Sequence, residues 1–218
     1  MSHERQDQRL VRGSETRQRI LARAVDIASS LGLEGLSIGD LAGELGMSKA
    51  GVFAHFGSKE ELQLATMNAA REIFVLKNAA KVFTAKAGIP RVWTLCQSLL
   101  DYLATDTFRG GCFFAAASSE YDDRPGAVRD RLVEIMREWL SILSSILGEA
   151  KTVGDLSADS DPEQLAFELH ALQAGANWAR KLLGDQHALE RARTAMLSRL
   201  ESSATTKGKR LLRGLLAR

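Results

Sequence analysis

One short segment gathers side chains suited to binding a nucleic acid rather than to carrying out a reaction. Ser48, Lys49, Ala50 and His55 are small or polar and would face outward from one short helix. Small residues at a helix N-terminus allow its backbone to enter a major groove, and Lys49 could reach a guanine edge or a phosphate. Lys59 follows at the start of another helix, where its charge and the unsatisfied N–H groups favour a phosphate. These residues indicate contacts with duplex DNA.

Those side chains require two short helices joined by a tight turn. The apolar residues of 38–45 recur at helical spacing, and Ser37 before them is a suitable N-cap. Gly46 follows directly and can take the positive φ that ends a helix at no steric cost. A second helix over about 49–55 would turn Val52 toward the core and its polar side outward. The pattern is that of a helix-turn-helix DNA reader, and a purely structural helical hairpin is the alternative.

The segment from about Thr16 to Leu62 resembles the N-terminal domain of TetR-type (TetR/AcrR) bacterial transcriptional regulators. The residues that carry the resemblance are Thr16-Arg17, Ala24, Gly32, Gly35 to Ile38, Leu41-Ala42, Leu45 to Lys49, Val52 to Phe56 and Ser58 to Leu62. By this resemblance, the DNA-contacting residues would be Thr16, Ser37, Ser48, Lys49, Ala50, Phe53, His55 and Lys59. Phe53 departs from the family pattern, which often has a tyrosine there, so this position has no hydroxyl group to offer a phosphate.

The resemblance also implies a homodimeric, ligand-responsive regulator, most often a repressor. Its two recognition helices would read a palindromic operator in adjacent major grooves, about 34–36 Å apart. A helix over 59–84 would connect the DNA-binding part to the body, which is the rest of the chain after it. This helix would act as a lever when an unidentified small-molecule effector binds.

Two alternatives stay open beside this reading. One is an architectural or constitutive DNA-binding regulator without an effector. The other is a cysteine-dependent enzyme that uses Cys112 or Cys96 with His170. No third orienting group accompanies those residues at a recognisable spacing, so the sequence favours a protein that is not an enzyme.

Composition and charge favour a cytoplasmic protein of two domains. The 218 residues suit one small domain and one larger domain with its own core. The net charge is only +2, but residues 1–25 carry a net +3 and residues 205–218 a net +5, so both ends could approach phosphates. The sequence has neither a signal-peptide core nor an apolar run of membrane-spanning length, which predicts no membrane contact. Cys96 and Cys112 suit a reducing compartment, and the lack of Cys and His clusters predicts no metal or other cofactor.

The whole chain predicts an all-α fold, in which a three-helix helix-turn-helix head joins a larger helical domain for effector binding and dimerisation. Its prolines look like helix-entry residues, and no alternating run of β-branched residues suggests a strand. The expected helices are about 15–31, 38–45, 49–55, 59–84, 90–105, 113–121, 125–148, 162–183 and 186–203. A loop is expected over 151–160. The expected parts are a disordered arm over 1–13, the head over 14–60, the effector and dimerisation domain over 61–204 and a basic tail over 205–218.

Two sets of residues in the body carry further expectations. Aromatic side chains on several helices could enclose an apolar effector pocket lined by Trp93, Cys96, Phe113, Phe114, Trp139, His170 and Trp178. Apolar stripes in the last two expected helices predict a four-helix dimer interface formed by Leu165, Leu169, Leu172, Ala176, Met196 and Leu200. For both sets, packing within the chain's own core is the alternative.

Overall fold

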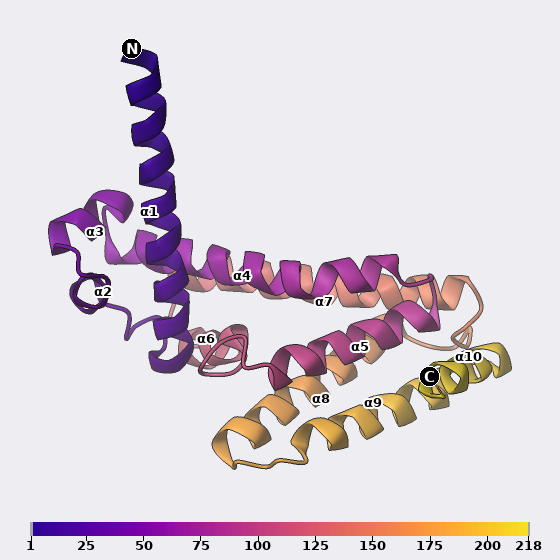
Figure 1. Cartoon of the computed structure of the whole chain (residues 1–218). Helices are drawn as coiled ribbons and strands as arrows, with labels where there is room; N and C mark the ends of the chain where they lie inside the picture. The colour runs from indigo at the N-terminus through magenta and orange to yellow at the C-terminus, as the bar shows by residue number, and fades with distance from the viewer. Residues whose placement is uncertain (1, 218) are drawn as a thin grey trace. The chain divides into compact units, whose positions relative to one another are not determined.

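The computed structural model of the chain describes the backbone of residues 2–217 and the side chains of residues 10–78 and 81–217. Within these residues the protein is all-α, as the sequence predicts, with ten helices and no strand (Figure 1). In chain order the helices are α1 (Ser2–Leu31), α2 (Ile38–Leu45), α3 (Lys49–Phe56), α4 (Lys59–Thr84), α5 (Ile89–Ala104), α6 (Phe113–Tyr121), α7 (Ala127–Thr152), α8 (Pro162–Leu182), α9 (Ala188–Ser203) and α10 (Thr206–Leu216).

The helices divide into two compact units that do not follow the order of the chain. The first unit comprises Met1–Ile73 and Phe108–Leu132, and the second comprises Phe74–Thr107 and Val133–Arg218. Helices α4 and α7 therefore each contribute residues to both units. This division differs from the expected boundary near residue 60, because α6 and the start of α7 belong to the same unit as the helix-turn-helix segment.

In the first unit, α2 and α3 each begin directly after a serine N-cap. The Ser37 hydroxyl accepts the N–H of Asp40 at the start of α2, and the Ser48 hydroxyl accepts the N–H of Gly51 at the start of α3. Helices this short are not stable alone, so packing has to hold them. Their apolar sides join α1 and the start of α4 in a core of Ile20, Ala24, Ile27, Leu36, Leu41, Ala42, Val52, Phe56 and Leu62.

The turn between α2 and α3 depends on Gly46, which has a left-handed backbone with φ +63°. Gly46→Val is expected to lower the free energy of unfolding by about 2 kcal/mol, because a β-branched residue is strained at positive φ. Gly43→Val is the matched control, since Gly43 lies inside α2 with open space where a side chain would begin. Denaturant unfolding of both variants tests this, and an unchanged transition in Gly46→Val would contradict the turn.

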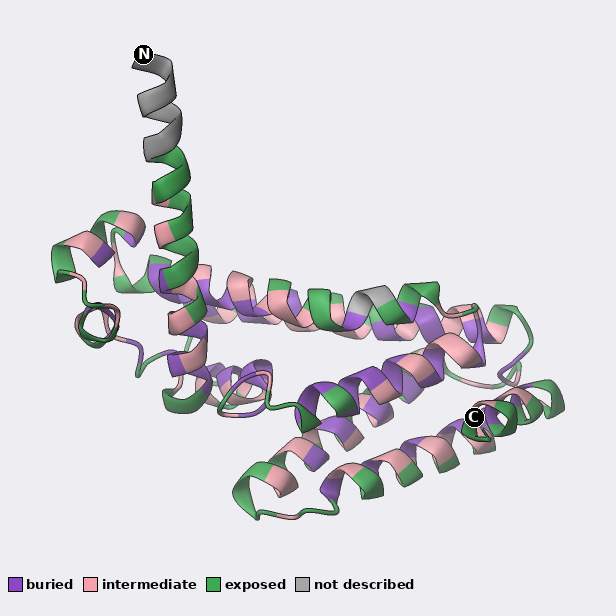
Figure 2. Ribbon diagram, in the orientation of Figure 1, coloured by how far each residue is buried: buried purple, intermediate pink, exposed green. Residues whose placement is uncertain are grey.

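In the second unit, α5 is the most deeply buried helix (Figure 2). It packs against α8, α9 and α10, and α8 also packs along α9. The shared core includes Val92, Trp93, Cys96, Leu99, Leu100, Leu143, Ile146, Leu147 and Leu212. In this core, α8 and α9 each turn one apolar side toward α5. The apolar residues on those sides are therefore buried within the chain.

The residues predicted for a dimer interface belong to this same core, so that prediction needs correction. All six pack within one chain: Leu165, Leu169, Leu172, Ala176, Met196 and Leu200. Apart from the partly buried Leu172, each is at most 5% exposed. The two apolar stripes are present as the sequence predicts, but the chain itself covers them and no partner is needed there.

Both ends of the chain are helical where the sequence predicts an arm or a tail. Helix α1 begins at Ser2, so the arm expected to be disordered over 1–13 is helical, apart from its first residue, which lies outside the description. Most of the basic tail expected over 205–218 forms α10, whose N-cap Thr205 accepts the N–H of Gly208. Helix α7 continues to Thr152 and shortens the loop that is expected to begin at 151.

Candidate nucleic-acid interface

Helix α3 is anchored on one side and exposed on the other. Val52 and Phe56 are 0% and 7% exposed and belong to the core of the first unit. Lys49, Ala50 and Phe53 all lie on the exposed side, as the predicted recognition surface requires. Phe53 is 51% exposed, which is unusual for a phenylalanine and places an apolar ring on this surface.

Lys49 lies close to the first turn of α2. A Cβ atom built at Gly39 would come within 3.0 Å of Lys49 Cε and 3.2 Å of Lys49 Nζ. The absence of a side chain at Gly39 therefore leaves room for the lysine. The sequence gives no sign of this role, because it depends on a side chain ten residues further along the chain.

The two capping serines differ in how far their hydroxyl groups are occupied. Ser37 Oγ accepts the Asp40 N–H at 3.1 Å and donates to the Asp40 carboxylate at 2.6 Å, so both its donor and one acceptor site are used locally. Ser48 Oγ accepts the Gly51 N–H at 3.0 Å and keeps its proton for another acceptor. A phosphate requires a donor, so Ser48 suits a phosphate contact better than Ser37 does.

Two of the other predicted contact residues already have partners. The Thr16 hydroxyl donates to the Arg12 carbonyl oxygen at 2.8 Å within α1. Lys59 Nζ donates to the carbonyl oxygen of Glu34 at 2.8 Å and to its carboxylate at 3.0 Å. An ammonium group has three donors, so Lys59 retains one for a phosphate.

The C-terminal end of α3 carries a contact that the sequence did not reveal. The guanidinium carbon of Arg17 lies 4.8 Å from the centre of the Phe56 ring, in cation–π geometry. His55 is half-buried beside the same ring, with 6.3 Å between ring centres. Arg17 thus places a positive charge from α1 beside the end of α3, the helix predicted to contact DNA.

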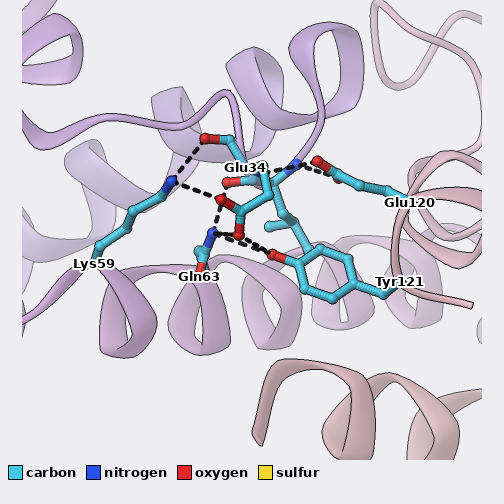
Figure 3. A network of polar contacts seen from close by, with 6 residues as sticks. Glu34, Lys59, Gln63, Glu120 and Tyr121 are labelled. Carbon is cyan, nitrogen blue, oxygen red and sulfur yellow. Dashed lines mark hydrogen bonds and ion pairs between the residues drawn. The ribbon is translucent and has the colours of Figure 1, made fainter. Parts of the chain in front are cut away.

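A polar network in the first unit fastens α6 to the segment after α1 (Figure 3). The Glu34 carboxylate accepts hydrogen bonds from Tyr121 Oη at 2.7 Å, Lys59 Nζ at 3.0 Å and Gln63 Nε2 at 3.1 Å. The Glu120 carboxylate accepts the N–H groups of Leu33 and Glu34 at 2.7 and 2.9 Å. The network therefore joins α6 to the start of α4, directly beside Lys59 in the candidate interface.

Gly32 makes the close approach of α6 possible. Its φ is +80°, and a Cβ atom there would lie 2.7 Å from a Glu120 carboxylate oxygen. In the sequence, Gly32 stands out only through the family resemblance. The pairing with Glu120 spans almost ninety residues, and no local pattern in the sequence could have indicated it.

The Glu34 network predicts a particular dependence of stability on pH. The Tyr121 hydroxyl, followed by Lys59 and Gln63, lowers the pKa of the Glu34 carboxyl from 4.5 to about 2. A carboxyl group whose pKa is lower in the folded state stabilises the fold above its unfolded pKa. Its contribution then disappears as the pH falls from about 4.5 toward about 2.

We therefore expect Glu34→Gln to lower the melting temperature at pH 7 and to flatten its decline over that acidic range. Thermal unfolding followed by circular dichroism at a series of pH values measures both effects. Glu15→Gln is the control, because Glu15 is an exposed carboxylate on α1, and it should follow the wild-type curve. Parallel curves for wild type and Glu34→Gln would rule out this role for Glu34.

The residues predicted for one effector pocket fall into three places. Trp93, Cys96, Trp139 and His170 belong to the second unit, where Trp139 Nε1 donates to His170 Nδ1 at 3.4 Å. In the first unit, the Phe113 ring meets the ring of its neighbour Phe114 edge to face, with 5.3 Å between ring centres. Trp178 is 56% exposed on α8, so its assignment to an enclosed pocket is corrected.

The hypothesis of a cysteine-dependent enzyme gains no support from the geometry. Burial raises the pKa of the Cys96 thiol to about 12, which is the opposite of what an activated nucleophile needs. Cys112 is also buried, and it belongs to the first unit whereas His170 belongs to the second.

Among the described helices, none is long and apolar enough to cross a membrane.

Two family models match the chain, one over the helix-turn-helix segment and one over most of the remaining helices. Residues 20–66 match the family described as "Bacterial regulatory proteins, tetR family", and residues 88–196 match "Tetracyclin repressor-like, C-terminal domain". The HTH-type transcriptional regulator SrpR of Pseudomonas putida is 26% identical over 148 residues, which cover 67% of this chain and 66% of SrpR. The HTH-type transcriptional repressor DhaR of Mycobacterium sp. (strain GP1) is 24% identical over 188 residues, which cover 84% of this chain and 91% of DhaR.

A solved structure extends the likeness to most of the fold. A TetR transcriptional regulator from Chloroflexus aurantiacus superposes with a TM-score of 0.82 at 25% identity, covering 88% of this chain and 98% of that one. The protein is therefore a helix-turn-helix, DNA-binding transcriptional regulator. More specifically, the chain belongs to the TetR family of bacterial regulators.

Proposed function

We propose that the protein is a repressor that binds a palindromic operator as a homodimer and releases it when a small-molecule effector binds. The observation that carries the proposal is the surface of α3, where Lys49, Ala50 and Phe53 are exposed while Val52 and Phe56 hold the helix in the core. Ser48 and Arg17 add donors and charge at its two ends. The similarity to DhaR, a transcriptional repressor, supports repression rather than activation.

The outer side of α8 supports a homodimer. Phe167, Trp178 and Leu182 are 65%, 56% and 68% exposed. With the exposed Ala171 and Gly175, they recur every three or four residues along one side, opposite the side that packs in the core. A helix that is apolar on two opposite sides needs a second partner, and a contiguous exposed apolar stripe marks such a contact. We assign this stripe, referred to below as the α8 stripe, to a two-fold contact with a second copy of the chain.

A dimer also meets the requirement of specificity. One recognition helix contacts only a few base pairs, whereas two helices about 34–36 Å apart read two half-sites on the same side of the duplex. Titration of a labelled duplex, with mass measured by light scattering, should give two protomers for each palindromic site. One protomer for each site at saturation would contradict the proposed dimer.

Buried and half-buried polar and aromatic groups in the second unit support an effector site there. The Phe74 ring meets the Tyr102 and Trp139 rings edge to face, with 5.2 and 5.5 Å between ring centres. Burial lowers the pKa of His170, which favours its neutral form beside Trp139. Apolar surface with a few polar groups is typical of small-molecule sites. We propose that Trp93 and Cys96 line the deeper part of the same region, because both are buried on α5.

We propose that helix α4 couples effector binding to DNA binding, because it contributes residues to both units. An effector changes operator affinity only if it binds one arrangement of the helices more tightly than the other. A thermal-shift screen of small molecules, followed by operator titration with each hit, tests this. A compound that raises the melting temperature and weakens operator binding in wild type, but not in Trp139→Ala, supports the proposal. A screen in which no stabilising compound affects operator binding favours a constitutive regulator.

A further inference from the structure

An acidic residue holds the side chain of Lys59, which is predicted to bind a backbone phosphate. Lys59 Nζ donates to the carbonyl oxygen of Glu34 at 2.8 Å and to its carboxylate at 3.0 Å. Both side chains are 45% exposed, so the pair lies at the surface of the first unit. A carboxylate repels phosphates, and its presence here therefore does not follow from phosphate binding.

The Glu34 carboxylate is fixed in place by two further donors (Figure 3). Tyr121 Oη of α6 donates to it at 2.7 Å, and Gln63 Nε2 of α4 donates at 3.1 Å. Both donor side chains are buried, and Gln63 also donates to the Leu33 carbonyl oxygen at 2.8 Å. These contacts hold the pKa of the Glu34 carboxyl at about 2, so it keeps its negative charge at any physiological pH.

Fastening α6 to the segment after α1 does not require the lysine. Without Lys59, the Glu34 carboxylate would keep its donors from Tyr121 and Gln63. The Glu120 carboxylate joins α6 to the same segment independently, through two backbone N–H groups. An exposed ion pair contributes little to stability. The contact between Glu34 and Lys59 therefore acts on the lysine more than on the fold.

The pair offers a phosphate less than a free lysine would. Counterions are released from DNA in proportion to the positive charge that the protein brings to its phosphates. The charges of Lys59 and Glu34 sum to zero, and two of the three N–H donors of Lys59 are occupied. A phosphate must therefore compete with a fixed carboxylate for this lysine.

We propose that Glu34 weakens the phosphate contact of Lys59 and so limits the sequence-independent part of DNA binding. The inference rests on the proposed operator binding and deepens it. Phosphate contacts carry no base sequence information, so the limit applies equally to every duplex. An effector lowers operator affinity only by a limited factor, and a smaller phosphate contribution makes release from the operator easier.

The test compares Glu34→Gln with Glu72→Gln, which removes the same charge from an exposed position of α4. Fluorescence anisotropy gives the affinity of each variant for an operator duplex, selected from a random pool, and for an unrelated duplex. The salt concentration is varied over about 50–200 mM, because the slope of log affinity against log salt counts the phosphate contacts. Circular dichroism and light scattering establish that each variant is folded and associates as wild type does at the temperature used.

For Glu34→Gln we expect the affinity for both duplexes to rise about fivefold, the factor that one unit-charge interaction at about 4 Å in water represents. The slope should steepen by about 0.9, as for one added phosphate contact. A residue that only stabilises the fold would have the opposite effect, because its loss would weaken operator binding. Glu72→Gln should keep the wild-type values, since it lies roughly 20 Å along α4 from Lys59, about two Debye lengths away.

Two further variants test whether the effect passes through the lysine. In a Lys59→Gln background, Glu34→Gln should give less than half of the gain, because the lysine that the carboxylate restrains is absent. Tyr121→Phe removes one hydrogen bond of the network but leaves the charge on Glu34, so it should not strengthen binding.

An unchanged or lower affinity in Glu34→Gln would overturn the inference, and so would an equal gain in Glu72→Gln or Tyr121→Phe. A gain of more than half that remains without Lys59, or one confined to the operator duplex, would also count against it. All these results leave the proposed function standing, provided that the wild-type protein prefers the operator to the unrelated duplex. A wild-type protein without that preference would instead refute operator binding itself, so the two failures are distinguishable.

Discussion

Replacing Trp178 with arginine should separate the dimer into monomers and abolish high-affinity operator binding. The side chain lies in the middle of the α8 stripe and is 56% exposed in a single chain, so the change leaves the core of that chain intact. A buried aromatic residue in the centre of an interface typically contributes about 2–4 kcal/mol, which corresponds to a loss of dimer affinity of roughly 30- to 1000-fold. An arginine facing its symmetry mate adds a repulsion between like charges.

Size-exclusion chromatography with light scattering measures the mass of the variant, and anisotropy titration measures its affinity for the operator. Ser141→Arg is the control, because it adds the same charge at an exposed position of α7. That variant should remain a dimer with wild-type affinity. A dimeric Trp178→Arg variant would show that the chain associates through another surface.

Replacing Lys49 and His55 together with alanine should weaken operator binding without affecting the dimer. Lys49 is exposed at the start of α3, and His55 is half-buried at its other end, so neither belongs to the core. A contact with a base edge typically contributes about 1–3 kcal/mol, and removing one or two of them should reduce the affinity for the operator by roughly 10- to 1000-fold. The affinity for unrelated duplexes should fall much less.

The matched control for charge is Lys77→Ala, which removes an exposed lysine from α4 outside the helix-turn-helix segment. It should bind the operator as wild type does. Two results would show that the recognition surface lies elsewhere. One is a wild-type affinity in the variant that lacks Lys49 and His55, and the other is a monomeric mass for that variant.

The helices that could be predicted from the sequence are those with strong local signals at their ends. Residues 38–45 and 59–84 form α2 and α4 with the expected bounds, because Ser37 and Gly46 delimit the first and Ser58 precedes the second. The outward side of α3 also follows from local spacing, since Val52 and Phe56 must both reach the core. For these three helices, local sequence signals are sufficient to predict the helix ends or the exposed side.

The sequence could not show which of the two apolar sides of α8 packs in the core of the chain. Leu165 and Leu169 lie on one side, and Phe167 and Trp178 on the other, and both sides have helical spacing. Only the packing against α5 shows that the chain covers the first side itself. The contact between Glu34 and Tyr121 could not be predicted from the sequence either, because it joins residues that are 87 positions apart.

At the two ends of the chain, polar composition and periodicity predict different structures, and the helices follow the periodicity. In 205–218 the spacing of Leu211, Leu212 and Leu215 is that of an amphipathic helix, and Thr205 is a suitable cap. The high content of Lys and Arg, taken alone, favours a basic tail. At the other end, the polar composition favours disorder, whereas the four-and-three spacing of Arg5, Arg9 and Arg12 is typical of a helix.

The most direct test of a dimeric, sequence-specific DNA reader is selection of bound duplexes from a random pool, at defined salt, with the purified wild-type protein. We expect enrichment of an inverted repeat whose half-sites lie about one helical turn apart, since two α3 helices would read adjacent major grooves. A pool that yields no motif, together with binding that decreases steeply with salt for every duplex, would contradict the account and indicate non-specific binding to the phosphate backbone.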